Sequence, residues 1–403
     1  SRPSADRPAA RSRPPKRVAL FAGAYNHIAD GVSLTLNRLV DYLERQGVDV
    51  CVFAPTSDDP AIPDYAGTLV PVPSVPAPGR SDYRVSLGLT PSVRDALEAF
   101  DPTLYHIATP DLLGRHAMHV AEKTGVPVVA SYHTHFSSYL KYYHLDLLED
   151  MVWSYLRSFY AKCAQIYVPS TAMAEILQSH GITDGLRLWQ RGVETDTFAP
   201  RHRSMDWRRS LGIEEDEVVV AFVSRLVWEK GLDVYADVVE RLERQGVPHR
   251  SLIVGDGPAR EELEERLPET IFTGYLDGSA LSRAYASSDV FLFPSDTETF
   301  GNVTLEAMGS GLPTVCANAV GSRDLVDPGT TGLLCTPGDT EAFTDAVRRL
   351  VVDDEQRAAM GTAARERAME FNWDAILAQM NTYYDEVLAK PVASSFDGAT
   401  TAS

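Results

Sequence analysis

The stretch at residues 291–313 reads FLFPSDTETFGNVTLEAMGSGLP, and it decides the fold class. An apolar run over 290–293 predicts a buried strand, a polar loop follows, and helical spacing begins at about Gly301. A strand that leads through a loop into a helix is half of a βαβ unit, which belongs to a parallel sheet in an α/β protein. The free backbone N–H groups at the start of such a helix favour a phosphate.

The same pattern occurs twice more, once in each half of the chain. Each series has an apolar strand, an amphipathic helix that ends at a glycine, and a second strand. The first series comprises 17–21, 32–43 and 48–54, and the second comprises 218–223, 232–242 and 251–254. Two series of this kind predict two doubly wound domains in one α/β chain, with a ligand cleft between the carboxyl ends of their strands.

The domain boundary is expected in the stretch 191–209, which is polar and lacks periodicity. The expected division is a disordered basic arm at 1–16, a first domain at 17–200, a second domain at 201–372, a last helix at 373–390 and a disordered tail at 391–403.

Composition narrows the function classes. The 403 residues are 44% hydrophobic and 23% charged, which excludes a collagen-like or wholly disordered chain. With 37 basic and 56 acidic residues the net charge is −19, so binding to nucleic acid is not expected. There is no run of 18 apolar residues, and the first 17 residues lack the apolar segment of a signal peptide. The four cysteines have no CxxC spacing, and we expect a cytoplasmic chain.

Two basic residues in the stretch 223–233 (VSRLVWEKGLD) are the clearest candidates for binding a diphosphate. Arg225 and Lys230 follow a predicted strand and lie in the loop before a helix. Both side chains can reach the carboxyl edge of the sheet, where two cations would neutralise a nucleoside diphosphate leaving group. The alternative is a pair of surface cations, which the apolar neighbours disfavour.

Two acidic residues flank the start of the helix near residue 301. A carboxylate beside a bound diphosphate would be repelled, so Glu298 is better suited to accept hydrogen bonds from neutral hydroxyl groups. Glu306 has the same chemistry for a ribose. Acidic residues near helix N-termini are common, and that ordinary explanation is equally strong for each carboxylate alone.

Other patterns are weaker. Gly274 and Tyr275 end a predicted strand, where their backbone groups can meet a base or simply form a turn. His133 and His135 lie two residues apart on an extended segment without a local third ligand, so no metal is expected, and one histidine is a candidate polar catalytic group. His106 has the pattern of a core residue at a strand end.

The stretch 136–167 mixes aromatic and basic residues at helical spacing. Its candidates for an acceptor-binding or membrane-facing surface are Tyr139, Lys141, Tyr142 and Tyr143. The alternative is ordinary core with extended cation side chains, because neighbouring acidic residues oppose an anionic lipid.

Together these residues resemble family GT4, the retaining glycosyltransferases with the GT-B fold, over residues 17–390. The resemblance rests on E-x7-E, from Glu298 to Glu306, and on R-x4-K, from Arg225 to Lys230, with RGVETDTFAP between the halves. SYHTHFSSYLKYY is similar to sulfoquinovosyl-diacylglycerol synthases. DTETFGNVTLEAMGSGLP and ADGV look like GDP-mannose-dependent glycolipid mannosyltransferases. The family's Gly-Gly at the first loop is Asp30-Gly31 here.

The resemblance implies a role for each matching residue. Arg225 and Lys230 bind the diphosphate, Glu306 binds the ribose, and Glu298 holds hydroxyls of the donor sugar. The backbone around Gly274 and Tyr275 meets the base. Further implied contacts are those of Phe300, Gly301 and Asn302 with the sugar, of His133 with the reacting sugar, and of Gly31 with the diphosphate and acceptor.

The implied fold is α/β GT-B, two doubly wound Rossmann-like domains facing a cleft. The implied reaction moves a sugar from a UDP- or GDP-linked donor to a lipid or glycolipid with retention, without metal or other cofactor, on the cytoplasmic membrane face as a peripheral protein. Alternatives are a soluble sugar or polysaccharide acceptor, a sugar phosphorylase or epimerase, and a silent binding subunit, although none of the four signature side chains is lost.

Overall fold

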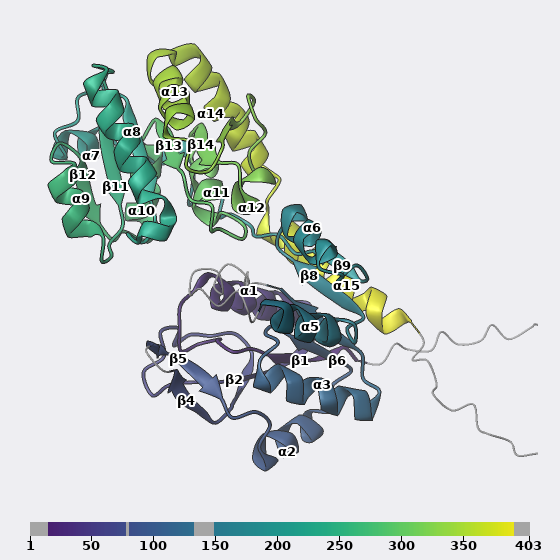
Figure 1. The fold of residues 1–403 in the computed structure, drawn as a ribbon. Coiled ribbons are helices and arrows are strands. Elements are labelled where there is room, and N and C mark those ends of the chain that lie inside the picture. Colours follow the sequence, from purple (N-terminus) through teal and green to yellow (C-terminus); the bar gives the residue numbers. More distant parts are fainter. Residues whose placement is uncertain (1–14, 78–79, 133–148, 391–403) are drawn as a thin grey trace, which may run out of the picture. The chain divides into compact units, whose positions relative to one another are not determined.

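The computed structural model describes residues 15–77, 80–132 and 149–390. The chain falls into two compact units (Figure 1). The first unit takes its described residues from Ser1–Ser131, Ser158–Ile166 and Asn381–Ser403, and the second takes them from Tyr132–Arg157 and Tyr167–Met380.

A seven-stranded sheet has the order β3-β2-β1-β6-β7-β8-β9. Its strands are β1 (Arg17–Phe21), β2 (Asp49–Ala54), β3 (Thr68–Pro71), β6 (Leu104–Ile107), β7 (Val128–Ser131), β8 (Gln165–Val168) and β9 (Leu186–Leu188). Central β1 pairs in parallel with β2 and β6 and is almost wholly buried, as expected when helices cover both faces. The sheet continues to β9 although the compact units divide within β8, so the boundary at residue 200 stays a prediction.

Helices and one hairpin complete the elements associated with this sheet. The helices are α1 (Gly31–Arg45), α2 (Pro91–Phe100), α3 (Leu112–Thr124), α5 (Glu149–Tyr160) and α6 (Thr171–Ser179), and the hairpin pairs β4 (Ser74–Ala77) with β5 (Arg80–Ser86). The hairpin was not predicted from the sequence, because β4 has only four residues and contains Pro76. The last helix, α15 (Trp373–Ala389), begins in the second unit and contributes its residues from Asn381 onward to the first.

His106 on β6 is completely buried in the first unit. Its Nδ1 lies 2.6 Å from the hydroxyl of Tyr384 on α15, and its Nε2 lies 2.5 Å from Oγ of Ser131 on β7. Burial lowers the pKa of the imidazole from 6.5 to about 3, so the ring is neutral at physiological pH. His106 is therefore a core residue that joins two strands to the last helix.

We expect the free energy of unfolding to fall in acid because of His106. Between pH 6.5 and about 3 the unfolded chain binds a proton on this ring and the folded chain does not, so stability is lost as the pH falls. The free energy of unfolding should drop by about 1.4 kcal/mol for each pH unit in the middle of this window. Urea unfolding from pH 7 to pH 4 should show that the free energy of unfolding falls less in His106→Gln than in the wild type or in the exposed control His119→Gln. Equal slopes would contradict this account.

A six-stranded sheet in the second unit has the order β12-β11-β10-β13-β14-β15. The strands are β10 (Val219–Val223), β11 (Arg250–Val254), β12 (Ile271–Gly274), β13 (Val290–Phe293), β14 (Thr314–Ala317) and β15 (Gly332–Cys335). Its helices are η2 (Pro200–His202), α7 (Met205–Ser210), η3 (Trp228–Lys230), α8 (Leu232–Arg244), α9 (Arg260–Arg266), α10 (Gly278–Ala286), α11 (Asn302–Gly309), α12 (Val320–Arg323), α13 (Thr340–Val352) and α14 (Asp354–Met369). All five strand pairs are parallel.

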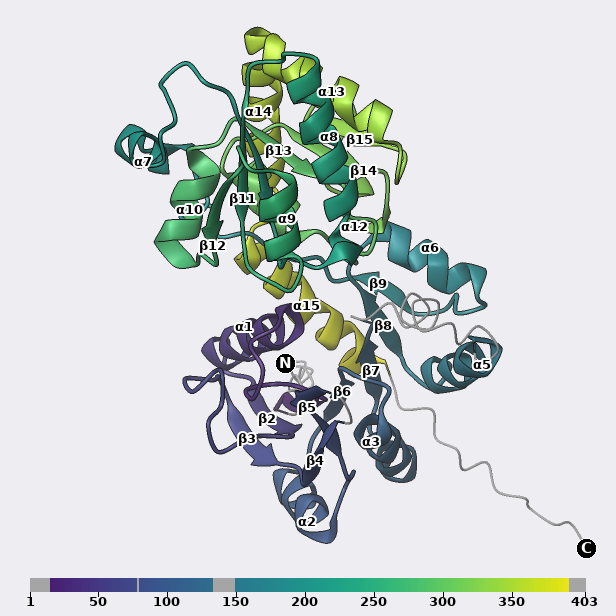
Figure 2. The same cartoon turned by 60° about the vertical axis from the view of Figure 1, so that its left-hand side comes forward.

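The chain builds this second sheet outward in two directions. From β10 it moves through β11 to β12, and it then returns to β13 on the other side of β10 and continues to β15. Right-handed crossovers in opposite directions put their helices on opposite faces. The observed packing agrees, because α8 contacts α13 (Figure 2), while α11 contacts α10 and α14. The two α/β series predicted from the sequence are confirmed.

No helix among the described residues is both long enough and apolar enough to cross a membrane.

Candidate functional site

Two loops leave the second sheet at the point where its strand order reverses. Residues 224–231 follow β10, and residues 294–301 follow β13. Because β10 and β13 are paired in parallel, both loops start from the same carboxyl edge. In open α/β sheets this reversal is where ligands bind, so the topology of the second unit alone identifies a candidate site.

Close backbone contact fixes these two loops against each other. Gly231 has φ +73°, and a Cβ built on it would lie 2.9 Å from the carbonyl carbon and oxygen of Pro294. The hydroxyl of Thr297 donates to the carbonyl oxygen of Glu229 over 3.2 Å. Glycine is required at 231 both for its conformation and for the space.

The loops place a cation and a carboxylate in contact. Nζ of Lys230 lies 2.5 Å from Oε1 of Glu298, and the two side chains are 21% and 25% exposed. Arg225, on the same loop as Lys230, is exposed, and its side chain has no hydrogen bond or ion pair among the described residues. The predicted pair of cations is therefore unequal, since one is neutralised by a carboxylate and the other faces solvent.

Helix α11 begins directly after the second loop with uncapped N–H groups. Its cap residue is Gly301, with φ +87°, and no side chain bonds to the first turn. A Cβ on Gly301 would lie 2.4 Å from the carbonyl oxygen of Gly321, so α12 packs directly against this turn. Phe300 is buried, with its ring centroid 6.1 Å from that of Phe371, whereas Asn302 is exposed. The arrangement leaves backbone donors at a helix N-terminus, which favours an anion.

Glu306 lies one turn into α11 and is partly buried. The hydroxyl of Tyr285, fully buried on α10, donates to Oε2 of Glu306 over 3.1 Å. Burial raises the pKa of Glu306 from 4.5 to about 7, and the Tyr285 hydrogen bond opposes this shift. At neutral pH the carboxyl group can therefore accept hydrogen bonds and, in its protonated form, donate one.

The raised pKa of Glu306 should weaken the ligand-free protein as the pH rises. Between pH 4.5 and about 7 the folded state keeps a proton that the unfolded state has lost, so this contribution is present in acid and is lost toward pH 7. Glu306→Gln keeps the acceptor for Tyr285 and cannot ionise. From pH 5 to pH 8 its unfolding free energy should fall less than that of the wild type, by up to about 3 kcal/mol. Urea unfolding measures this, and the exposed control Glu243→Gln should follow the wild type.

Gly274 and Tyr275 lie at the end of β12, two strands away from β10. The carbonyl oxygen of Gly274 accepts from the backbone N–H of Gly255 over 2.9 Å. The side chain of Tyr275 is 73% exposed, an unusual state for a large aromatic residue. A flat ring is therefore available at the carboxyl edge beside β11.

In the first unit, the start of α1 is already capped. Oδ1 of Asp30 accepts from the N–H groups of Val32 and Ser33 over 3.0 and 2.8 Å. Gly31 is the first residue of the helix and is exposed. A carboxylate at this helix start already satisfies the donors that would otherwise meet a phosphate. The role of Gly31 stays a prediction.

The loop after β1 also holds two residues that the sequence analysis missed. Asn26 and His27 are 2% and 8% exposed. Nδ1 of His27 lies 3.0 Å from the carbonyl oxygen of Pro55, while its Nε2 and Oδ1 of Asn26 are buried without a partner among the described residues. Buried polar atoms of this kind are usually hydrogen-bonded, so these two atoms have unused hydrogen-bonding capacity in the loop after β1. Nothing in the local sequence signals their burial.

Five predicted residues lie outside the described residues, namely His133, Tyr139, Lys141, Tyr142 and Tyr143. Within the described residues, no group of three or more His, Cys, Asp or Glu side chains is arranged to hold a metal ion.

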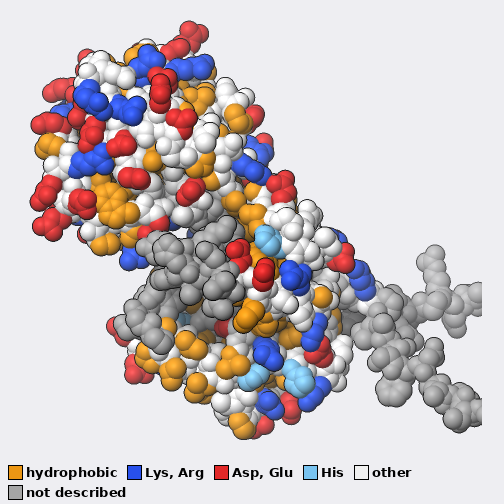
Figure 3. Space-filling view, viewed as in Figure 1, with side chains coloured by type: hydrophobic (Ala, Val, Ile, Leu, Met, Phe, Trp, Pro, Cys, Tyr) orange, Lys and Arg blue, Asp and Glu red, His pale blue; other side chains and the backbone are white. Residues whose placement is uncertain are grey.

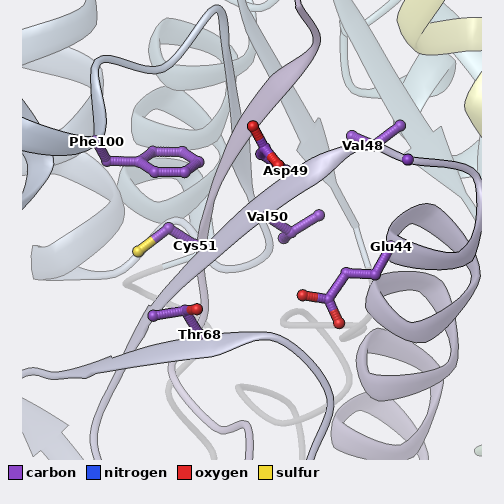
Figure 4. A pocket seen from close by; sticks show the side chains of 8 residues that line it. Glu44, Val48, Asp49, Val50, Cys51, Thr68 and Phe100 are labelled. Carbon is purple, nitrogen blue, oxygen red and sulfur yellow. The ribbon is translucent and has the colours of Figure 1, made fainter.

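A pocket of about 410 Å³ lies elsewhere on the first unit (Figure 4). Its lining includes Glu44, Asp49, Cys51, Thr68 and Phe100. Because Asp49 is the first residue of β2 and Glu44 lies in the last turn of α1, this pocket is at the amino edge of the first sheet, opposite the loop that follows β1. Acidic and basic side chains are interspersed on the visible face of the second unit (Figure 3).

Two family models match the chain. Residues 29–197 match "Glycosyltransferase Family 4", and residues 204–367 match "Glycosyl transferases group 1". The second match includes Arg225, Lys230, Glu298 and Glu306, and so covers the whole site built on the second sheet.

Curated relatives match almost the full chain. A GDP-mannose-dependent alpha-mannosyltransferase of Corynebacterium glutamicum is 34% identical, covering 93% of this chain and 90% of the relative. The sulfoquinovosyl transferase of Arabidopsis thaliana is 35% identical, covering 90% of this chain and 72% of the relative. Among solved structures, sucrose-phosphate synthase of Thermosynechococcus elongatus aligns with a TM-score of 0.77 at 22% identity, covering 93% of this chain and 99% of that one.

Proposed function

We propose, from the premise that this chain belongs to glycosyltransferase family 4 and uses a nucleotide-sugar donor, that it is a retaining, metal-independent α-glycosyltransferase. The donor is a UDP- or GDP-linked hexose, and the acceptor is a lipid or glycolipid. The observation that carries the proposal is the convergence of Arg225, Lys230, Glu298 and the uncapped start of α11 at the reversal point of the second sheet.

Charge neutralisation on the leaving diphosphate is the main task of this site. Arg225, Lys230 and the free N–H groups of α11 are donors that can surround the two phosphates. Preorganised donors of this kind stabilise the charge that develops as the bond to the sugar breaks. Since these groups supply the positive charge, the reaction as proposed needs no metal ion.

Acceptor groups orient the rest of the donor. Glu298 accepts hydrogen bonds from sugar hydroxyls, and Glu306, held by Tyr285, meets the ribose. The backbone of Phe300, Gly301 and Asn302 lies beside the sugar. At the other end of the donor, the base packs near Gly274 and Tyr275.

In the proposed reaction, the bond between the anomeric carbon and the phosphate oxygen breaks as the acceptor oxygen bonds to the same face of that carbon. Because the new bond forms on the face that the phosphate leaves, the configuration is retained. The released phosphate oxygen takes the proton of the acceptor hydroxyl, which balances the charge. In this proposal His133 acts on the reacting sugar, and Gly31 allows close approach of the diphosphate and the acceptor. The protein contributes by positioning the reactants and by stabilising the charge that develops on the diphosphate.

The acceptor assignment rests on the relatives' names. They include a sulfoquinovosyl transferase and an alpha-monoglucosyldiacylglycerol synthase, the latter 26% identical over 74% of this chain. On this proposal, the stretch holding Tyr139, Lys141, Tyr142 and Tyr143 meets the acceptor or the cytoplasmic membrane face.

Product analysis tests the proposal. The protein is incubated with UDP-, GDP- and ADP-hexoses and with vesicles that contain diacylglycerol or a glycolipid, with and without EDTA, and lipid extracts are analysed by mass spectrometry. We expect one donor to give a glycosylated lipid in both conditions, with an α-anomeric coupling by NMR. A sugar product in the aqueous phase alone would replace the lipid acceptor by a soluble one, and loss of product with EDTA would refute metal independence.

A further inference from the structure

We propose that Glu298 exchanges partners during turnover, and that this exchange makes the site prefer an intact nucleotide-sugar over the nucleoside diphosphate left after transfer. The inference rests on the proposed function and concerns the same site. Without a sugar, Glu298 holds Lys230; with a sugar, Glu298 turns to the sugar hydroxyls and Lys230 turns to the phosphates.

The starting state of the exchange is the ion pair in the structure. Nζ of Lys230 lies 2.5 Å from Oε1 of Glu298, whereas Arg225 carries no partner among the described residues. A diphosphate alone therefore meets one available cation and one that a carboxylate already neutralises. To gain the second cation it has to displace Glu298, which contributes repulsion of its own.

The surrounding backbone keeps the two side chains within reach. The contact of Gly231 with Pro294 and the hydrogen bond from Thr297 to Glu229 tie the two loops together. On the other side, a Cβ built on Gly321 would lie 2.3 Å from the Cβ of Glu298, so α12 lies directly against this residue. Glu298 is thus confined between α12 and Lys230, and the exchange is a side-chain rotation.

Sugar hydroxyls change the balance between these contacts. They donate to the carboxylate and replace the hydrogen bonds it received from Lys230, so that the ammonium group is released toward the phosphates. A nucleoside diphosphate has no such hydroxyls at this position. After transfer Glu298 returns to Lys230, which weakens the hold on the product and favours its release.

Glu298→Gln isolates this role, because it keeps the size and a hydrogen-bonding amide while it removes the charge that holds Lys230. A partly exposed ion pair corresponds to about a three- to tenfold effect on an equilibrium. We expect UDP or GDP to bind Glu298→Gln about three- to tenfold more tightly than the wild type, and the preference for the matching nucleotide-sugar to shrink by the same factor or more.

Isothermal titration calorimetry of the full chain with UDP, GDP and their hexose conjugates measures these affinities. Glu229→Gln is the matched control, since it removes a neighbouring exposed carboxylate whose side chain does not contact Lys230. In a Lys230→Met background, where only the repulsion between Glu298 and the phosphates remains, Glu298→Gln should change diphosphate affinity clearly less than it does in the wild type. Thermal melting verifies that each variant is folded.

The outcomes separate the two proposals. If the wild type binds a diphosphate and Glu298→Gln binds it no more tightly than Glu229→Gln does, the exchange is refuted and the donor site stands. If the effect of Glu298→Gln is unchanged in the Lys230→Met background, simple repulsion explains it and the exchange is again refuted. If the wild type binds none of these nucleotides, the proposed function falls, and the exchange with it.

Discussion

Arg225→Ala is expected to lower kcat/KM for the nucleotide-sugar donor by about 10²- to 10³-fold, the loss that follows removal of one preorganised donor to a developing charge. Arg225 is the exposed cation of the site and has no partner among the described residues. Its removal should therefore change the free energy of unfolding by less than about 0.5 kcal/mol.

Initial rates with the donor identified by product analysis measure this effect, and urea unfolding measures the stability. Arg283→Ala on α10 is the control, because it also removes an exposed arginine from the second unit. A fall of less than fivefold for Arg225→Ala, or an equal fall for Arg283→Ala, would show that Arg225 does not neutralise the leaving group.

Gly301→Ala is expected to reduce both stability and activity. At φ +87° a side chain is strained, and the new Cβ would lie 2.4 Å from the carbonyl oxygen of Gly321. The conformational strain corresponds to about 1–2 kcal/mol and the overlap to about 1–3 kcal/mol. Relief of the overlap requires α11 to move away from α12, and a displacement of its first turn should reduce kcat/KM by about 10²-fold.

Gly329→Ala separates the effect of strain from the effect of overlap, because Gly329 has φ +84° but no atom lies within 4 Å of a Cβ built on it. Strain alone should lower the free energy of unfolding of Gly329→Ala by about 1–2 kcal/mol, and this variant should keep full activity. Denaturant unfolding and donor kinetics on both variants give the comparison. Equal losses at the two positions would mean that the contact with α12 has no part in shaping the start of α11.

Much of the fold could be predicted because a buried parallel strand and an amphipathic helix each leave a clear apolar pattern. The strands at 17–21 and 290–293 have the expected bounds, and Gly301 is the cap of the expected helix. The hairpin at residues 74–86 was missed because β4 has only four residues, including Pro76, and β5 contains few apolar residues.

The site could be predicted only in part. Spacing indicated that Lys230 and Glu298 lie on loops at one sheet edge, but not that they are in contact, because that depends on which strands are neighbours. Likewise, the hydrogen bond between Tyr285 and Glu306 joins residues that are 21 positions apart and lie on two different helices. The capping of α1 by the carboxylate of Asp30 was not predicted, although aspartate is a preferred residue at this position.

The most direct test of the central claim is calorimetric titration of the intact protein with UDP, GDP and ADP in EDTA, beside Arg225→Ala. A nucleotide-binding site on the second sheet predicts saturable binding of UDP or GDP at one site per chain, weakened at least tenfold in Arg225→Ala. Absence of binding to all three nucleotides, or equal binding to the variant, would contradict the claim that this switch point binds the donor.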